Sequence, residues 1–186
     1  MRVIAGKARR LQLKTPQGLD TRPTADRTKE TLFNILNPYL ADSDFLDLFA
    51  GSGAIGIEAL SRGAKYAAFV DKDKAALDCI KMNLKTTRLE SDAEIFPMDA
   101  LHAIRALELK GKVFDFIFMD PPYNHMLERD ILMMLHNSNI VYCDTIIIVE
   151  ASLDTGFDYL EDTRFQIYKR KQYKTNQHVF IMVKED

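Results

Sequence analysis

The sequence lacks any hydrophobic run long enough to cross a membrane. No uninterrupted apolar stretch approaches the ~20 residues that a transmembrane helix needs. The first ten residues, MRVIAGKARR, also lack the apolar core of a signal peptide. We therefore expect a cytoplasmic protein without a membrane partner. No internal repeat or low-complexity segment interrupts the 186 residues, whose number fits one domain with a sizeable core.

The chain is also poor in residues that form disulfides or bind metals. Its two cysteines, Cys79 and Cys143, lie in separate predicted elements without CxxC spacing, and we expect both to be buried free thiols. The four histidines are scattered along the chain in the same way. We therefore expect no metal site.

The chain carries little net charge, but positive charge is concentrated in its first 30 residues. Residues 1–30 hold eight Lys and Arg against three acids, a net charge of +5, although the whole chain carries −2. The runs RVIA and LQLKT flank a glycine and basic residues, which predicts a hairpin that presents Arg9 and Arg10 at its turn. Charge alone would fit a solvated tail equally well. The hairpin pattern favours an arm that contacts a polyanion such as RNA.

The rest of the chain alternates strand-like and helical patterns. This alternation predicts an α/β fold with a doubly wound parallel sheet, closed by an antiparallel hairpin. Ligands of such sheets bind beyond the carboxyl ends of the strands. We expect strands at residues 45–49, 65–70, 93–98, 113–119, 145–149, 165–173 and 178–183, and helices at residues 25–36, 54–61, 74–84, 100–109 and 128–135.

A glycine turn follows the first expected strand. In DLFAGSGAIG the glycines Gly51, Gly53 and Gly56 satisfy the GxGxxG pattern, and Asp71 stands twenty residues after Gly51, where a ribose-binding acid is expected. Small residues here let a ligand approach the backbone. By spacing alone, the pattern fits a nicotinamide dinucleotide or another adenosine cofactor.

Two further acids favour S-adenosylmethionine over a dinucleotide. Asp47 lies in the strand just before the glycines, where its negative charge would repel a pyrophosphate but attract an ammonium or a sulfonium. Asp99 closes the third strand and is placed to accept a hydrogen bond from an adenine amino group. The sequence therefore predicts a cofactor with a cationic sulfur.

The stretch FIFMDPPY is the second functional motif. Its apolar run predicts a buried strand, which Asp120 ends and Pro121 and Pro122 prevent from continuing. Proline carbonyls accept hydrogen bonds without a competing N–H, and Tyr123 offers a flat face for stacking. These groups suit a planar base with an exocyclic amine. An ordinary turn after a strand is the alternative.

Two other groups of basic and polar residues are candidate RNA contacts. Arg22, Thr24 and Arg27 lie at or near the start of the first helix, where helix capping and surface charge are the alternative roles. A second basic run contains no acid among residues 164–174, and lysines on an edge strand would also discourage aggregation. This run comprises Arg164, Lys169, Arg170, Lys171 and Lys174.

Taken together, DLFAGSG, the acid at position 71 and DPPY resemble the amino-methyltransferases that use S-adenosylmethionine. With RVIAGKARR and TRPTADRTKETLFNIL in the same order, the whole chain resembles the RsmD family of bacterial 16S ribosomal RNA guanine-N2 methyltransferases. The family often has Glu where Asp71 stands, which keeps the carboxylate but changes its reach. The resemblance implies a class I methyltransferase fold, with a mostly parallel seven-stranded Rossmann-like sheet and a small N-terminal β-hairpin extension.

The resemblance also implies residue roles. Asp120, Pro121, Pro122 and Tyr123 would bind the target guanine and support catalysis. The arm and the first helix would contact 16S RNA through Arg9, Arg10, Arg22, Thr24 and Arg27. The cofactor would be held by Asp47, Phe49, Gly51, Gly53, Asp71, Lys72, Asp99, Ala100 and Asp120.

We therefore expect residues 1–22 to form a basic RNA-contacting extension and residues 23–186 a monomeric methyltransferase domain. Three alternatives stay open on sequence alone. DNA adenine-N6 methyltransferases share DPPY, although this chain is short for a separate target-recognition domain. A dinucleotide-binding oxidoreductase and a catalytically silent RNA-binding module are the other two.

Overall fold

The computed structural model describes residues 1–16, 23–122 and 126–184, and within the first helix it describes side chains from Asp26 onward. Contacts divide the chain into two compact units, Met1–Asp99 and Ala100–Asp186. Each unit is described below by itself.

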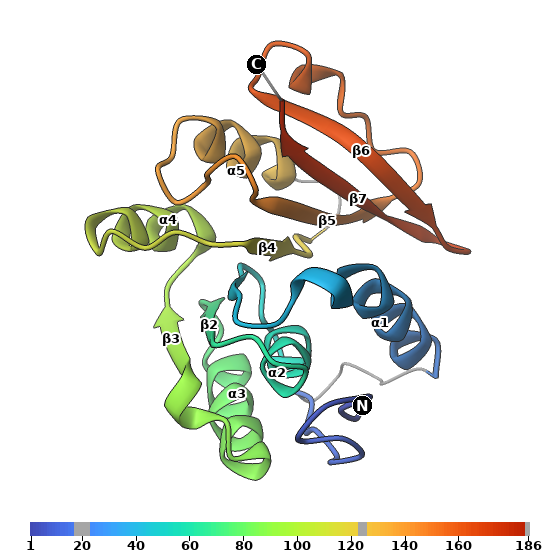
Figure 1. Cartoon of the computed structure of the whole chain (residues 1–186), viewed down its shortest axis with the longest axis vertical. Coiled ribbons are helices and arrows are strands. Elements are labelled where there is room, and N and C mark those ends of the chain that lie inside the picture. Colours follow the sequence, from blue (N-terminus) through green and yellow to red (C-terminus); the bar gives the residue numbers. More distant parts are fainter. Residues whose placement is uncertain (17–22, 123–125, 185–186) are drawn as a thin grey trace. The chain divides into compact units, whose positions relative to one another are not determined.

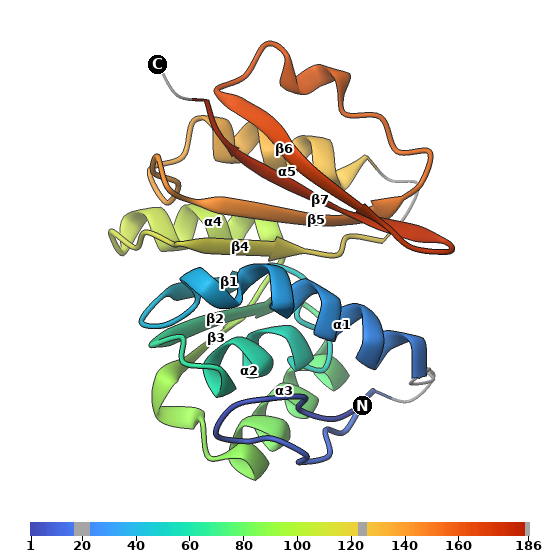
Figure 2. The same ribbon diagram turned by 45° about the vertical axis from the view of Figure 1, so that its right-hand side comes forward.

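The first unit contains three parallel strands in the order β3-β2-β1. Figure 1 labels β2 and β3, and Figure 2 labels all three. Helices α2 and α3 pack against these strands, and the interior of β2 is fully buried. In chain order its elements are α1 (Pro23–Leu36), η1 (Asn37–Tyr39), β1 (Asp44–Asp47), α2 (Ala54–Ser61), β2 (Tyr66–Asp71), α3 (Lys74–Thr87), η2 (Glu90–Asp92) and β3 (Ala93–Pro97).

The third glycine of the GxGxxG pattern sets how closely α2 approaches β2. A Cβ atom at Gly56 would lie 2.4 Å from the ring of Phe69, which is fully buried on β2. Only glycine permits this contact, because no real Cβ lies so close to a ring carbon. The helix that follows the glycine turn is thereby held directly on the strand that ends in Asp71.

The N-terminal arm, residues 1–16, forms one antiparallel bridge, between Arg2 and Gln12, in place of the two regular strands expected there. The predicted turn exists, and both Arg9 and Arg10 are exposed on it. Several backbone N–H groups of the arm bond to α2 in place of the opposite run, which explains why the short runs do not form a longer ladder. Figure 2 shows the arm lying over α2 and α3.

Buried charges on α1 and α2 hold the arm in place. The Glu58 carboxylate, fully buried on α2, accepts hydrogen bonds from the N–H groups of Ile4 and Ala5 at 2.8 and 3.0 Å. Lys29 Nζ lies 3.2 Å from Glu58 Oε2 and donates to the Arg2 carbonyl. Burial lowers the pKa of Lys29, and its attraction to Glu58 opposes that shift. The arm is therefore a docked part of this unit.

The second unit combines two parallel strands with an antiparallel pair, in the order β4-β5-β7-β6. Figure 2 shows β6 and β7 as a long hairpin beside β5. A register shift lies between Ile167 and Lys169. The elements are α4 (Ala100–Leu109), β4 (Phe116–Met119), α5 (Leu127–His136), β5 (Ile146–Ser152), η3 (Asp158–Leu160), β6 (Phe165–Gln172) and β7 (Asn176–Val183).

One expectation about a single residue was wrong. Cys143 is exposed, because it lies in the turn before β5 and not in a buried element, whereas Cys79 is buried as expected.

Arg164, the first residue of the basic run, is half-buried and bonds to backbone carbonyls of its own unit. Its guanidinium donates to the carbonyls of Leu135 and Ser138, both at 2.9 Å, and burial lowers its pKa.

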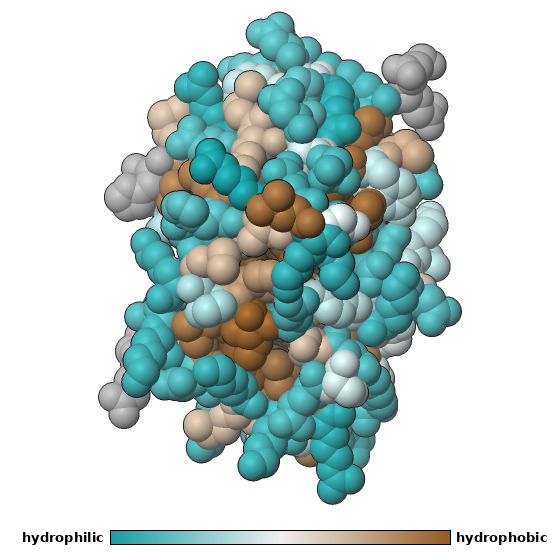
Figure 3. Space-filling model, turned by 90° about the vertical axis from the view of Figure 1, so that its left-hand side faces the viewer, coloured by the Kyte–Doolittle hydropathy of each residue, from teal (hydrophilic) through white to brown (hydrophobic). Residues whose placement is uncertain are grey.

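On the face drawn in Figure 3, hydrophilic surface is interrupted by small separate areas of apolar surface. Leu109 and Tyr39 are the most exposed large apolar side chains, at 90% and 70%. Within the described residues, no helix is both long and apolar enough to span a bilayer. The same residues contain no group of three His, Cys, Asp or Glu side chains arranged to hold a metal ion.

Candidate active site

The glycine turn joins β1 to α2 and opens on one side. Gly51 and Gly53 have φ values of +52° and +77°, a backbone region that glycine adopts without strain. No atom lies within 4 Å of the place where a Cβ of Gly51 would be, so the turn is open there. The Ala50 N–H donates to the Val70 carbonyl at 2.9 Å, which ties the turn to β2. A ligand can therefore approach the backbone at Gly51.

Asp47 is a buried carboxylate beneath this turn. Its side chain is 1% exposed, and its Oδ2 accepts a hydrogen bond from the Gly56 N–H at 3.2 Å. Its Oδ1 is buried with no hydrogen-bond partner among the described residues. Burial raises the pKa of Asp47 to about 7, against the opposing effect of the Gly56 N–H. A buried acceptor without a partner is costly, and a cationic ligand nearby would reduce that cost.

Asp71 ends β2 and faces the glycine turn. Its Oδ2 accepts from the Gly51 N–H at 2.8 Å, and its Oδ1 accepts from the Asp73 N–H at 2.9 Å. A carboxylate has about four acceptor sites, so these two bonds leave capacity for ribose hydroxyls. The neighbouring Lys72 is exposed.

The predicted cofactor residues of the first unit gather at one edge of its sheet. β1, β2 and β3 run parallel, with Asp47 paired to Phe69 and Asp71 paired to Pro97. The carboxyl ends of the three strands therefore share an edge. Exposed Asp99 follows two residues after β3, and Phe49, half-buried, lies in the turn after β1. Of the other predicted cofactor residues, Ala100 is the buried first residue of α4 in the second unit, and Asp120 follows β4 there.

Asp120, Pro121 and Pro122 follow β4 in the second unit, and we name these three residues the proline corner. Asp120 is exposed, Pro121 is buried and Pro122 is exposed. β4 pairs in parallel with β5, with Met119 opposite Val149. Tyr123 lies outside the described residues, so its predicted stacking role is not placed.

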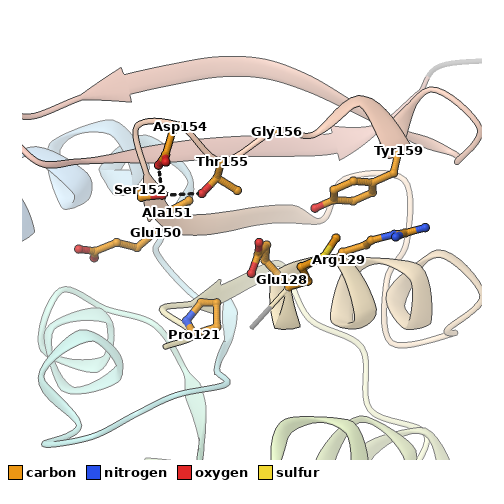
Figure 4. Close-up of a pocket in the computed structure, with 11 residues that line it drawn as sticks. Pro121, Glu128, Arg129, Glu150, Ala151, Ser152, Asp154, Thr155, Gly156 and Tyr159 are labelled. Atoms are coloured by element: carbon orange, nitrogen blue, oxygen red, sulfur yellow. Dashed lines mark hydrogen bonds between the residues drawn. The ribbon is translucent and has the colours of Figure 1, made fainter. Parts of the chain in front are cut away.

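A pocket of about 390 Å³ adjoins this corner (Figure 4). The Tyr159 hydroxyl is buried without a partner among the described residues, and burial raises its pKa, so the phenol keeps its proton. Arg129 lies with its guanidinium carbon 5.8 Å from the centre of the Tyr159 ring. The pocket is lined by Pro121, Met126, Glu128, Arg129, Glu150, Ala151, Ser152, Asp154, Thr155, Gly156 and Tyr159.

The predicted RNA contacts are only partly described. Arg9 and Arg10 project from the turn of the arm, and Arg27 is exposed on α1. Arg22 lies outside the described residues, as does the side chain of Thr24. Sequence reasoning missed the acids that organise these regions, Glu58 under the arm and Glu150 beside the pocket. Lys29 pairs with Glu58 and His178 with Glu150, and each partner is distant in sequence from its acid. Arg62, four residues after Glu58, is the exception.

Comparison with known proteins gives a consistent result. The model of a family described as conserved hypothetical protein 95 matches residues 1–182. The ribosomal RNA small subunit methyltransferase D of Haemophilus influenzae is 40% identical over 83% of this chain and 80% of its own length. The Escherichia coli K12 protein of the same name is 35% identical over 84% of this chain and 77% of its own length.

Solved structures extend the likeness to the fold. The E. coli protein yhhF, described as a candidate methyltransferase, has a TM-score of 0.85 at 29% identity and covers 100% of this chain and 99% of its own. A hypothetical protein of Thermus thermophilus has a TM-score of 0.82 at 29% identity, covering 98% and 99%. The expected α/β fold with seven mostly parallel strands and an antiparallel C-terminal pair is confirmed.

Proposed function

Because the chain belongs to the family described as conserved hypothetical protein 95, the RsmD family, we propose that it methylates a guanine N2 of 16S ribosomal RNA with S-adenosylmethionine. The observation that carries this proposal is the match to two small-subunit RNA methyltransferases over four-fifths of the chain. In this proposal, the first unit binds the cofactor through its carboxylates and glycine turn. The second unit binds the target base at its proline corner.

The first unit fits S-adenosylmethionine. The open side of Gly51 would admit the methionine part, and the buried Asp47 would offset its positive charge. Asp71 would hold the ribose hydroxyls and Asp99 the adenine amine, while Phe49, Lys72 and Ala100 would complete the binding surface. A pyrophosphate would meet the charge of Asp47, which favours this cofactor over a dinucleotide. When bound, S-adenosylmethionine supplies an electrophilic methyl group on a positively charged sulfur.

The second unit would prepare the acceptor. The exocyclic amine of guanine is a poor nucleophile because its lone pair is delocalised into the ring. Hydrogen bonds from that amine to the Asp120 carboxylate and the Pro121 carbonyl favour a pyramidal nitrogen, which localises the lone pair. The Asp120 carboxylate or water takes the proton that the nitrogen loses on methylation. Positioning supplies most of the acceleration, so a strong base is not required.

The target base leaves its stack to reach this corner, where Tyr123 stacks on it. Arg9 and Arg10 on the docked arm contact RNA phosphates, as do Arg22, Thr24 and Arg27 near the start of α1. These contacts position the RNA and carry little sequence information. The proposal includes a monomeric enzyme in the cytoplasm, acting on 16S RNA or on the small ribosomal subunit.

Methyl transfer to mapped nucleotides tests the proposal. Small subunits from a strain that lacks the enzyme are incubated with the protein and labelled S-adenosylmethionine, and the labelled nucleotide is identified. We expect one guanine N2 to be labelled. Label on adenine N6, transfer to DNA in place of RNA, or no label on RNA would overturn the proposal.

A variant pair tests the role of the proline corner. Asp120→Ala should abolish transfer while S-adenosylmethionine binding, measured by calorimetry, is retained. Asp130→Ala removes an exposed carboxylate from α5 in the same unit and should retain transfer. Binding of NAD in place of S-adenosylmethionine would instead favour an oxidoreductase. Full transfer by Asp120→Ala would exclude the proposed role of this carboxylate.

A further inference from the structure

A polar cluster at the end of β5 has no role in the chemistry described so far. The Glu150 side chain, 20% exposed, accepts hydrogen bonds at both oxygens. Asn176 Nδ2 donates to its Oε1, and His178 Nε2 lies 3.2 Å from its Oε2. His178 is 1% exposed, and its Nδ1 lies 3.1 Å from the Tyr173 hydroxyl. We name Glu150, Tyr173, Asn176 and His178 the β5 cluster.

The proton positions in the β5 cluster follow from its donors. Burial, followed by the nearby charge of Glu150, raises the pKa of Tyr173 to about 12, so the phenol keeps its proton. The Glu150 carboxylate can only accept, so the Nε2–H of His178 donates to it, and in this tautomer Nδ1 accepts from the Tyr173 hydroxyl. Glu150 therefore receives two donors as a carboxylate and keeps further acceptor sites. His178 and Asn176 are positioning residues, because they fix the direction of this carboxylate.

The strand register brings Glu150 next to the proline corner. β4 and β5 are parallel, and their last paired positions are Met119 and Val149. Asp120 directly follows β4, and Glu150 is the next residue of β5 after Val149. Neighbouring strands lie about 4.8 Å apart, so the backbone at Glu150 runs beside the start of the proline corner. Pro121 and Glu150 also border the same pocket, on the side away from Tyr159 in Figure 4.

We propose that Glu150 selects guanine by accepting its N1–H while Asp120 and Pro121 hold the N2 amine. This inference rests on the proposed function. Guanine carries the N1–H and N2–H donors side by side on one edge. Two acceptor groups on neighbouring strand ends match that pair.

The same arrangement disfavours adenine. Adenine has a lone pair at N1, which would face the Glu150 carboxylate, repel it and offer its remaining acceptor site no donor. A site built to bond a substrate N–H rejects analogues that lack it by as much as about 10⁴-fold, because its polar group is then left unpaired. Glu150 would thus explain why a DPPY corner, which suits adenine amines equally well, acts on guanine here.

A base analogue tests this selection. 2-Aminopurine keeps the N2 amine but has a lone pair at N1. Small subunits are reconstituted with 16S RNA that carries guanine or 2-aminopurine at the mapped nucleotide, and kcat/KM is measured for both. We expect the wild-type protein to prefer guanine by about 100-fold or more. Glu150→Gln should lower kcat/KM for guanine by ~10-fold or more and reduce the preference, because its amide N–H can donate to N1 of 2-aminopurine.

Controls separate selection from folding. Asp158→Asn makes the same charge change at an exposed position of η3 and should leave the preference unchanged. Glu150→Asp keeps the carboxylate and should keep the preference for guanine at a reduced rate, which provides a second measurement if Glu150→Gln is unstable. An equal loss for both bases in Glu150→Gln, or loss of the guanine preference in Glu150→Asp, would overturn the role of Glu150. No guanine label with the wild-type protein would overturn the proposed function itself.

Discussion

The backbone N–H of Gly51 donates to Oδ2 of Asp71 over 2.8 Å, across two neighbouring strand ends. One carboxylate therefore supports the shape of the glycine turn and stands where ribose hydroxyls are expected. The length of the Asp71 side chain matters, because its carboxylate bonds directly to the Gly51 N–H. In the proposed function, Asp71 would link the glycine turn to the cofactor, which would account for an acid at this position.

Replacing Asp71 tests that link. Asp71→Ala should weaken S-adenosylmethionine binding by ~10-fold to 100-fold in calorimetry, because it removes the ribose acceptor and leaves the Gly51 N–H without its partner. Asp78→Ala removes an exposed acid from α3 in the same unit and should bind normally. Unchanged affinity in Asp71→Ala would exclude Asp71 from the cofactor site.

Cofactor affinity should depend on pH through Asp47. With a pKa of about 7, this group is largely protonated at pH 6 and largely ionised at pH 8. A cationic ligand prefers the ionised form, so affinity should rise by up to about tenfold over this interval. Calorimetry across the pH range measures the change, and Asp47→Asn should bind more weakly with a flatter profile. A wild-type profile as flat as that of the variant would contradict the assignment.

Stability of the cofactor-free protein should change in the opposite direction. The pKa of Asp47 is raised on folding from its usual 3.8 to about 7, so the folded state holds this proton more tightly than the unfolded state. The contribution of protonated Asp47 to the free energy of unfolding is complete below about pH 4. It is lost as the pH rises to about 7, and the total loss is up to roughly 4 kcal/mol. Urea unfolding should therefore show a steeper loss of stability in wild type than in Asp47→Asn. Parallel curves would exclude a buried carboxyl that titrates there.

The docked arm should depend on Glu58. Glu58→Ala leaves the Lys29 ammonium buried without its partner and frees two backbone N–H groups of the arm. We expect a loss of about 3–5 kcal/mol in the free energy of unfolding by urea. The exposed Glu30 on α1 provides the control, because Glu30→Ala should cost little. A loss below about 1 kcal/mol in Glu58→Ala would show that the arm is held by other contacts.

Charge on the arm should appear in the salt dependence of RNA binding. Arg9→Ala removes an exposed guanidinium without changing the anchor of the arm. The slope of log K against log salt should fall by about 0.7 to 0.9 for each phosphate that the variant no longer neutralises, with S-adenosylmethionine affinity unchanged. Lys110→Ala, at the end of α4, tests whether any lysine has the same effect. Equal slopes for wild type and Arg9→Ala would remove Arg9 from the RNA surface.

Much of the fold could be predicted because its signals are local. The bounds of α2 and α4 agree with the expected residues 54–61 and 100–109, since apolar spacing and a glycine turn define them within a few residues. The family resemblance was confirmed because it depends on short ordered motifs. The roles of individual site residues stay predictions.

The features that the sequence did not predict depend on contacts between residues far apart in the chain. Glu58 stands in the apolar helix AIGIEALS, and only the arm and Lys29 explain its burial. Glu150 was placed just beyond a strand expected to end at residue 149, whereas β5 runs to Ser152 because it pairs with β7. His178 is 28 residues further on. The spacing patterns of single helices and strands do not indicate such contacts between distant residues.

The anchor of the arm also sets an order of events during synthesis. The arm bonds to Glu58 and Ser61 on α2, and Lys14 bonds to Asn83 on α3. The arm therefore has no docking surface until these two later helices have folded. Until both helices are in place, the arm cannot hold Arg9 and Arg10 in their docked position.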